Sequence, residues 1–161
     1  MAATSTNKQP LLVDHVLHTV VDLKGATVAT GGGVDIGGTN NAELVVDSTT
    51  ADGCVLEDIY AISRDEAYTI KLYLSSANDY LRPQQGVYVG SFQSTSTTPG
   101  TVIRYADKPV VLAPVAHTGS ESQLTAFYIP KGKALWAAIE ANSANDQGDG
   151  APLLGVQGGW Y

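Results

Sequence analysis

The sequence has few charges, few basic residues and almost no cysteine. Charged side chains make up 16% of its 161 residues, well below the roughly 25% that is usual in soluble domains. Only 9 residues are Lys or Arg, against 16 Asp or Glu, and the net charge is -7. Nucleic-acid binders contact phosphates through clustered Lys and Arg. The composition therefore argues against a nucleic-acid partner.

The single cysteine, Cys54, excludes an internal disulfide. It begins a strand-like run, where we expect a buried structural thiol, and no histidine lies nearby to activate it as a nucleophile. Residues 1–10 lack the apolar stretch of a signal peptide. No apolar run reaches the ~18 residues of a membrane span. We therefore expect a soluble chain that is made in a cytoplasm and contacts no membrane.

Glycine and β-branched residues are abundant instead, with 17 Gly, 16 Val and 15 Thr. Apolar and polar residues alternate in short runs, which is the period of a half-buried strand. The run 68–74 places Tyr68, Ile70, Leu72 and Leu74 on one face. In 54–63, strict alternation predicts that one face carries Val55, Glu57, Ile59 and Ala61.

Eight to ten short strands are predicted, separated by Gly, Pro, Ser and Asn. The candidates are 11–23, 42–47, 54–63, 68–74, 86–92, 101–106, 109–113, 123–129, 134–141 and 153–161. The glycine-rich segment 25–41 is predicted to be a loop. The fold class that follows is all-β, an antiparallel β-sandwich of jelly-roll type. Residues 1–10 are expected to form an N-terminal extended arm, and residues 11–161 a single sandwich domain.

Segment 134–141 could be a short helix by propensity. A strand is the preferred interpretation, because it would close a hairpin with 123–129. The turn between them contains Pro130 and Gly132, and a glycine at that corner suits a type II turn.

Two motifs suggest chemistry but are incomplete. Residues 34–40, VDIGGTN, look like the first phosphate-binding hairpin of glucokinase-type sugar kinases, yet that two-lobed fold needs far more chain. Residues 145–150, NDQGDG, resemble part of a calcium loop, but the twelfth position is Val156 or Gln157 instead of the required Glu. A solvated turn is the favoured interpretation of 145–150, and a weak structural Ca²⁺ site remains the alternative.

Other polar residues do not form a cluster. His15 and His18 are three apart, so on a strand they point to opposite faces and cannot share a zinc ion. The neighbouring carboxylates Glu57 and Asp58 also diverge, and His117 lies in a loop without an evident partner. The eight tyrosines and two tryptophans are scattered, as core or interface residues are. We predict no catalytic residues, no metal ligands and no cofactor.

The C-terminal third resembles small structural proteins of tailed bacteriophages, cyanophages in particular. The main carrier is 126–138, AFYIPKGKALWAA, followed by the glycine-rich, aromatic end 155–161, GVQGGWY. The shorter stretches 98–102, TPGTV, and 112–115, LAPV, add to it. The resemblance spans about 65 residues, and the first 95 match more loosely in style.

This resemblance implies a virion component of jelly-roll type with no catalytic residues. We expect a decoration or cement protein on the outer capsid surface, which binds the major capsid protein and stabilises the shell. A homo-oligomer is expected, with a trimer favoured. The arm of residues 1–10 could lie along a neighbouring subunit. The alternative is a tail-associated or lectin-like module that recognises the host through exposed Tyr and Trp.

Overall fold

Strands account for all the regular secondary structure in the part of the chain that the structure describes. The computed structural model describes residues 15–28, 42–76, 86–95, 97–105, 126–140 and 150–160. The strands are β1 (His15–Asp22), β2 (Thr27–Val28), β3 (Glu43–Ser48), β4 (Gly53–Ile62), β5 (Tyr68–Ser75), β6 (Val87–Ser94), β7 (Val102–Arg104), β8 (Phe127–Pro130), β9 (Lys133–Glu140) and β10 (Leu153–Trp160). The predicted all-β fold class is confirmed.

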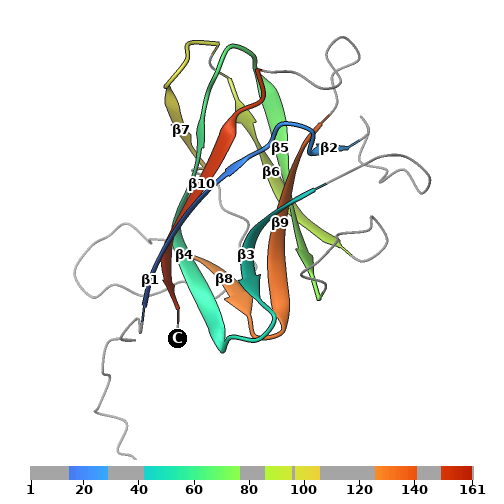
Figure 1. Ribbon diagram of the computed structural model, residues 1–161, viewed down its shortest axis with the longest axis vertical. Coiled ribbons are helices and arrows are strands. Elements are labelled where there is room, and N and C mark those ends of the chain that lie inside the picture. The colour runs from blue at the N-terminus through green and yellow to red at the C-terminus, as the bar shows by residue number, and fades with distance from the viewer. Residues whose placement is uncertain are drawn as a thin grey trace, which may run out of the picture.

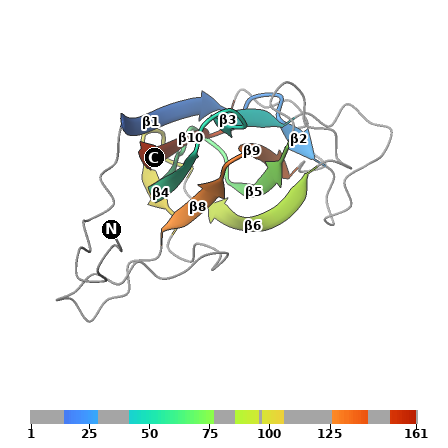
Figure 2. The same cartoon turned by 90° about the horizontal axis from the view of Figure 1, so that it is seen from below.

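The strands form two sheets that pack against each other as a β-sandwich (Figure 1). Sheet A has the order β1-β10-β4-β7, and β8 pairs with the other end of β4. Sheet B has the order β2-β9-β5-β6, and β3 also pairs with β9. Among these pairs only the two-residue strand β2 runs parallel to its neighbour. Strands β1 and β3 lie next to each other along one side of the sandwich (Figure 2).

The core lies between the sheets and is built from alternate residues of each strand. Leu56, Ile59 and Phe127 from sheet A and Leu72 and Leu135 from sheet B are fully buried. Burying one such side chain contributes roughly 1.5–3 kcal/mol. The strands therefore owe their stability mainly to this shared apolar layer. The predicted inward face of β5 is confirmed, because its alternate apolar residues all pack into this core.

A β-bulge breaks the strict alternation that the sequence predicts for β4. Leu56 and Ile59 are both fully buried although they are three residues apart. The register between β10 and β4 shifts between Gln157 and Gly158, opposite Glu57. The extra residue at a bulge moves the following side chains to the other face. Glu57 is exposed as a result, so the prediction that it shares a face with Ile59 is wrong.

The segment 134–141 is a strand, β9, as preferred, but the predicted hairpin with 123–129 is wrong. Strand β8 pairs with β4 in sheet A, whereas β9 pairs with β3 and β5 in sheet B. The turn at Lys131 and Gly132 therefore carries the chain from one sheet to the other. Gly132 has φ of 78°, as a type II turn requires, and its N–H donates to the Ser48 carbonyl at 2.9 Å.

Other predictions fall partly or wholly outside the described residues. The predicted loop 25–41 contains the short strand β2, which the glycine-rich sequence around it does not indicate. The arm of residues 1–10, the motif 34–40 and the candidate strand 109–113 lie outside the described ranges. His117 and nearly all of the candidate calcium loop 145–150 do so too.

Candidate functional site

The outward-facing side chains of sheet A form a broad surface, which we call the outer face of sheet A. They alternate with core residues along each strand, and residues paired across neighbouring strands lie side by side on the same face. The outer face comprises Val16, His18, Val20 and Asp22 of β1; Leu153, Gly155, Gln157 and Gly159 of β10; Val55, Asp58, Tyr60 and Ile62 of β4; Val102 and Arg104 of β7; and Tyr128 of β8.

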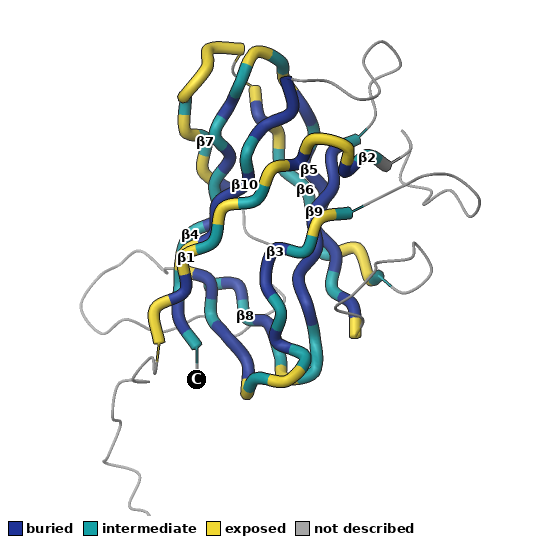
Figure 3. Tube along the Cα trace, viewed as in Figure 1, coloured by how far each residue is buried: buried dark blue, intermediate teal, exposed yellow. Residues whose placement is uncertain are grey.

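Exposed aliphatic side chains lie on this face on either side of a polar row formed by His18, Gln157 and Asp58. Val16 is 80% exposed, Val20 46% and Val102 48% (Figure 3 shows β1 and β7 with exposed segments). The outward positions of an antiparallel sheet that faces water are normally polar. Exposed valines at such outward positions favour a surface that contacts a partner. The outer face of sheet A is therefore the strongest candidate for a functional surface in the described residues.

Tyr60 shapes the middle of the face. Its ring lies directly over Gly155 of the neighbouring strand, so close that any Cβ at Gly155 would overlap it. The Tyr60 hydroxyl and His18 Nε2 form a hydrogen bond of 2.8 Å. Glycine thus lets a tyrosine lie flat across two strands, and His18 fixes its hydroxyl. Tyr60 is half-buried, so part of the residue remains accessible to solvent.

A second tyrosine, Tyr128, lies at the end of the outer face and also lies close to a glycine of the neighbouring strand, Gly53. A Cβ at Gly53 would lie 2.9 Å from the Tyr128 hydroxyl. Gly53 has φ of 120°, which also favours glycine there. Tyr128 and Gly53 come from neighbouring strands, β8 and β4. Tyr60 and Tyr128 are both half-buried, so each keeps part of its ring available to a partner.

Ion pairs neutralise two acidic groups of the outer face. Arg104 Nε donates to Asp58 Oδ2 at 2.9 Å, and Arg64 Nη2 donates to Asp22 Oδ2 at 2.8 Å. Partial burial raises the pKa of Asp22, but the Lys24 backbone N–H and the Arg64 guanidinium outweigh it and hold that pKa below its usual value. Each of the two carboxylates thus lies against a guanidinium group.

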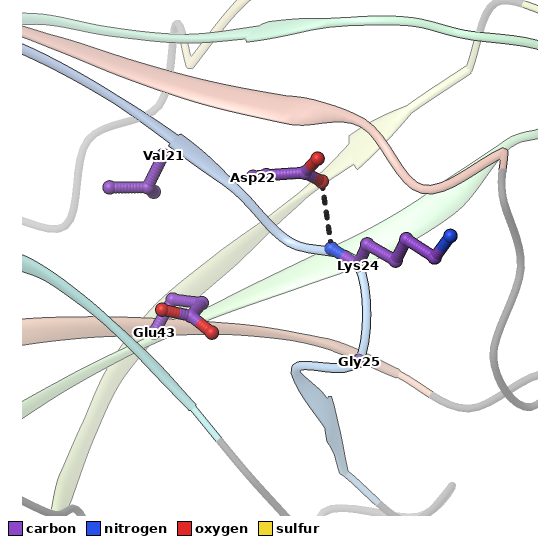
Figure 4. A pocket seen from close by; sticks show the side chains of 5 residues that line it. All are labelled: Val21, Asp22, Lys24, Gly25 and Glu43. Atoms are coloured by element: carbon purple, nitrogen blue, oxygen red, sulfur yellow. Dashed lines mark hydrogen bonds between the residues drawn. The ribbon is translucent and has the colours of Figure 1, made fainter.

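A shallow pocket lies beside the outer face, between the end of β1 and the start of β3 (Figure 4). It has a volume of about 630 Å³ and is lined by Val21, Asp22, Lys24, Gly25 and Glu43. Burial, and next the charge of Asp22, raise the pKa of Glu43. The lining contains two carboxylates, those of Asp22 and Glu43, and Asp22 is already paired with Arg64. In the described residues no group of three or more metal-ligating side chains is found.

The outer face of sheet B differs, because its aromatic residues are covered. Trp136 and Tyr73 are buried there together with Ala134 and Ala138. Lys71 Nζ lies 3.2 Å from Glu140 Oε1 as a largely buried ion pair. At the edge strand β6, the exposed Tyr88 meets Tyr73 edge to face with ring centroids 5.9 Å apart. The described tyrosines and tryptophans are therefore not gathered on a single exposed platform.

The remaining predicted residues can now be placed. Cys54 is fully buried, and burial raises the pKa of its thiol to about 12, so it is a protonated structural residue at neutral pH. His15 and His18 are both exposed on β1. Only His18 belongs to the outer face, through its bond to Tyr60. Glu57 and Asp58 diverge at the bulge and do not form a pair.

Sequence reasoning missed the outer face of sheet A. In 11–23, apolar residues occupy both alternating sets, which is typical of a strand buried on two sides. The signal that was available is the spacing of glycines in β10 at 155 and 159, opposite Val20 and Val16. Of these two, Gly155 leaves room for an aromatic ring of the neighbouring strand, that of Tyr60.

Comparisons of the chain with protein-family models, with curated proteins and with solved structures each find no match. In the part of the chain that the structure describes, no helix has the length and apolar character needed to cross a membrane. The outer face of sheet A and its paired charges are thus the features from which a function can be argued.

Proposed function

We propose that this chain is a non-enzymatic structural protein of a phage virion, which binds the assembled capsid as a decoration or cement protein. The observation that carries the proposal is the outer face of sheet A, on which Val16, Val20 and Val102 are exposed and the carboxylates Asp22 and Asp58 are paired. Such a surface suits contact with protein. The resemblance of 126–138 and 155–161 to small phage structural proteins supports a phage virion as the particle.

The strand order favours a jelly roll within the sandwich. In a jelly roll, a long two-stranded antiparallel ribbon winds into two sheets, so strands from the two ends of the chain pair in nested order. Here β1 pairs with β10, β3 with β9, β4 with β7 and β8, and β5 with β6. The pairs β10–β4 and β9–β5 then join successive turns of the ribbon into sheets. This nested order supports the jelly-roll assignment.

A cement protein stabilises a shell through many modest contacts. Each copy needs only a small interface with the major capsid protein, because the contacts of many copies add up over the lattice. A rigid sandwich suits this role, since it loses little conformational entropy when it binds. The net charge of -7 suits an outer capsid position better than contact with packaged DNA.

The test is co-sedimentation of the purified full chain with assembled shells that lack it. We expect the chain to pellet with shells in a saturable manner and to remain in solution with isolated capsid subunits. Absence of pelleting with shells would overturn the proposal. A variant without residues 2–10 tests the predicted arm separately: it should bind shells more weakly while it unfolds at the same denaturant concentration. Unchanged binding would exclude the arm as a contact.

The second candidate is a tail-associated or lectin-like recognition module. The observation in its favour is the pair of half-exposed rings of Tyr60 and Tyr128 on the outer face, with His18 bonded to Tyr60. Sugar rings stack on such aromatic faces, with neighbouring polar groups for orientation. It predicts saturable glycan or cell-surface binding that Tyr60→Ala abolishes. A flat glycan array together with no adsorption to cells would exclude it.

A further inference from the structure

We propose that the peptide between Asp52 and Gly53 is a site of spontaneous backbone isomerisation, and that the ion pair between Asp52 and Lys131 slows this reaction. The product is isoaspartate, in which the chain runs through the side-chain carbon Cγ of residue 52. The inference goes beyond the capsid proposal, because it concerns a covalent change of the free chain and needs no partner.

Asp52 lies in the connection 49–52, which carries the chain from β3 of sheet B to β4 of sheet A. The turn at Lys131 and Gly132 crosses between the sheets at the same end of the sandwich (Figure 1). The Gly132 N–H donates to the Ser48 carbonyl at 2.9 Å, and Lys131 Nζ donates to Asp52 Oδ1 at 2.6 Å. Lys131 therefore reaches Asp52 from the connection that runs alongside.

The local sequence and exposure favour attack of the backbone on the side chain. Gly53 has no Cβ, so no side chain next to its nitrogen obstructs the approach of that nitrogen to Asp52 Cγ. The Asp52 side chain is 71% exposed and lies in a stretch of bends between two strands. The chain has a second Asp–Gly pair, at 149–150, which serves below as an internal reference.

The reaction consumes and returns only water. The Gly53 nitrogen forms a bond to Asp52 Cγ, the Cγ–O bond of the neutral carboxyl breaks, and the hydroxyl leaves with the N–H proton as water. Water then opens the cyclic imide. Addition at the backbone carbonyl carbon of Asp52 breaks the bond from that carbon to the Gly53 nitrogen and gives isoaspartate, whereas addition at Cγ restores aspartate.

Lys131 opposes the first step. Attack requires the neutral carboxyl, because an ionised carboxylate is a poor electrophile. The hydrogen bond from Lys131, and next its positive charge, hold the pKa of Asp52 below its usual value. The ion pair thus lowers the fraction of reactive carboxyl and keeps one of its oxygens directed at Lys131. Because both side chains are largely exposed, the pair contributes little to stability, and its effect on the reaction can be measured in a folded variant.

Isomerisation would disturb the start of β4. Gly53 pairs with Pro130 of β8, and a Cβ at Gly53 would lie 2.9 Å from the Tyr128 hydroxyl and 3.1 Å from the Ile129 carbonyl oxygen. Isoaspartate adds a methylene to the backbone immediately before this closely packed glycine. Gly53 must then shift, which weakens the pairing of β4 with β8.

The test is incubation of the purified full chain, without shells, at mildly acidic pH above the ordinary pKa of aspartate. Peptide mapping by mass spectrometry then distinguishes isoaspartate from aspartate. We expect isoaspartate to accumulate slowly at residue 52 of the wild type and severalfold faster in Lys131→Gln. The matched control is Lys133→Gln, whose native lysine bonds to Ser76 and should leave the rate at residue 52 unchanged. The rate at residue 149 should be the same in all three chains.

A second readout follows the consequence for the fold. The isomerised wild type, separated from the unmodified chain, should unfold at a lower urea concentration, whereas unmodified Lys131→Gln and wild type should unfold together.

Three results would overturn the inference. One is an equal rate at residue 52 in wild type and Lys131→Gln. Another is the absence of isoaspartate at residue 52 from both chains. The third is a rate in Lys131→Gln that rises equally at residue 149, because the substitution would then loosen the whole chain. No shells enter this experiment, so failure of this inference and failure of the capsid proposal are distinguishable.

Discussion

The ring of Tyr60 lies directly over Gly155, at a point of β10 where no side chain projects. The contact joins β4 to β10 on the outer face of sheet A, and His18 of β1 completes it through its hydrogen bond to the Tyr60 hydroxyl. Three neighbouring strands are thereby tied together on the side of the sheet away from the core.

This contact predicts that Gly155→Ala destabilises the chain. The new Cβ overlaps the Tyr60 ring, so the ring must move and lose its bond to His18; such overpacking typically costs about 1–3 kcal/mol. Urea unfolding measures the loss. In a Tyr60→Ala background the same substitution should cost much less, because the obstructing ring is gone. An equal loss in both backgrounds would show that the ring does not determine the need for glycine.

A second prediction compares two neighbours on β4. Leu56 is fully buried, whereas Val55 points to the outer face and is only half-buried. Leu56→Ala should lower the free energy of unfolding by about 2–5 kcal/mol, because it leaves a cavity between the sheets. Val55→Ala should cost about 1 kcal/mol or less, since it removes no core contact. Denaturant unfolding of the two variants checks this, and a reversed order would contradict the assignment of faces.

The third prediction concerns alkaline pH. Burial, and next the hydrogen bond that its hydroxyl donates to Glu66, raise the pKa of Tyr68 to about 12. Burial, followed by the nearby Tyr88 and Glu140, raises the pKa of Tyr73 to about 12 as well. In the unfolded chain a tyrosine ionises near pH 10. The folded chain therefore keeps protons that the unfolded chain loses, and stability should be fully present below about pH 10 and fall as pH rises towards about 12.

Ultraviolet titration of tyrosine measures this directly. Tyr68 and Tyr73 should ionise about two pH units above a free tyrosine. Unfolding midpoints in urea should decrease over the same interval. A titration in which every tyrosine ionises near pH 10 while the chain stays folded would contradict the burial of these two residues.

The fourth prediction tests the paired charges of the outer face. Arg104→Ala removes the partner of Asp58. Its effect on the free energy of unfolding should stay below about 1 kcal/mol, because the guanidinium is mostly exposed. Binding to assembled shells should weaken, since an unpaired carboxylate then lies on the surface from which capsid binding is proposed. The control is Lys131→Ala, which removes a similarly exposed partner, that of Asp52, away from the outer face. An equal loss of co-sedimentation with shells in both variants would contradict a role for the Asp58 pair.

Alternation allowed most of the described strands to be predicted, because each strand buries one face against the opposite sheet. It fails at the bulge in β4, where Glu57 adds one residue and Leu56 and Ile59 both face inward. A bulge depends on the register with a partner strand, here at Gly158 of β10, and that register is not contained in the local pattern. The outer face of sheet A could not be predicted for the same reason, because the rows of side chains that form it depend on the register of β1, β10 and β4.

The turn at Lys131 and Gly132 shows a second limit of sequence reasoning. The residues predicted a tight turn with a positive φ at glycine, and that geometry is confirmed. They do not determine whether the flanking strands pair with each other or enter different sheets. That choice is made by long-range partners, β4 for β8 and β3 and β5 for β9. Local turn chemistry therefore gave the conformation of the chain but the wrong pairing.

The most direct test of the central proposal is electron microscopy of shells that lack this protein, imaged before and after the purified full chain is added. The account predicts new density on the outer capsid surface, at repeated lattice positions, into which the two-sheet sandwich fits. Density that appears only on tails, or shells that look the same before and after addition, would contradict it.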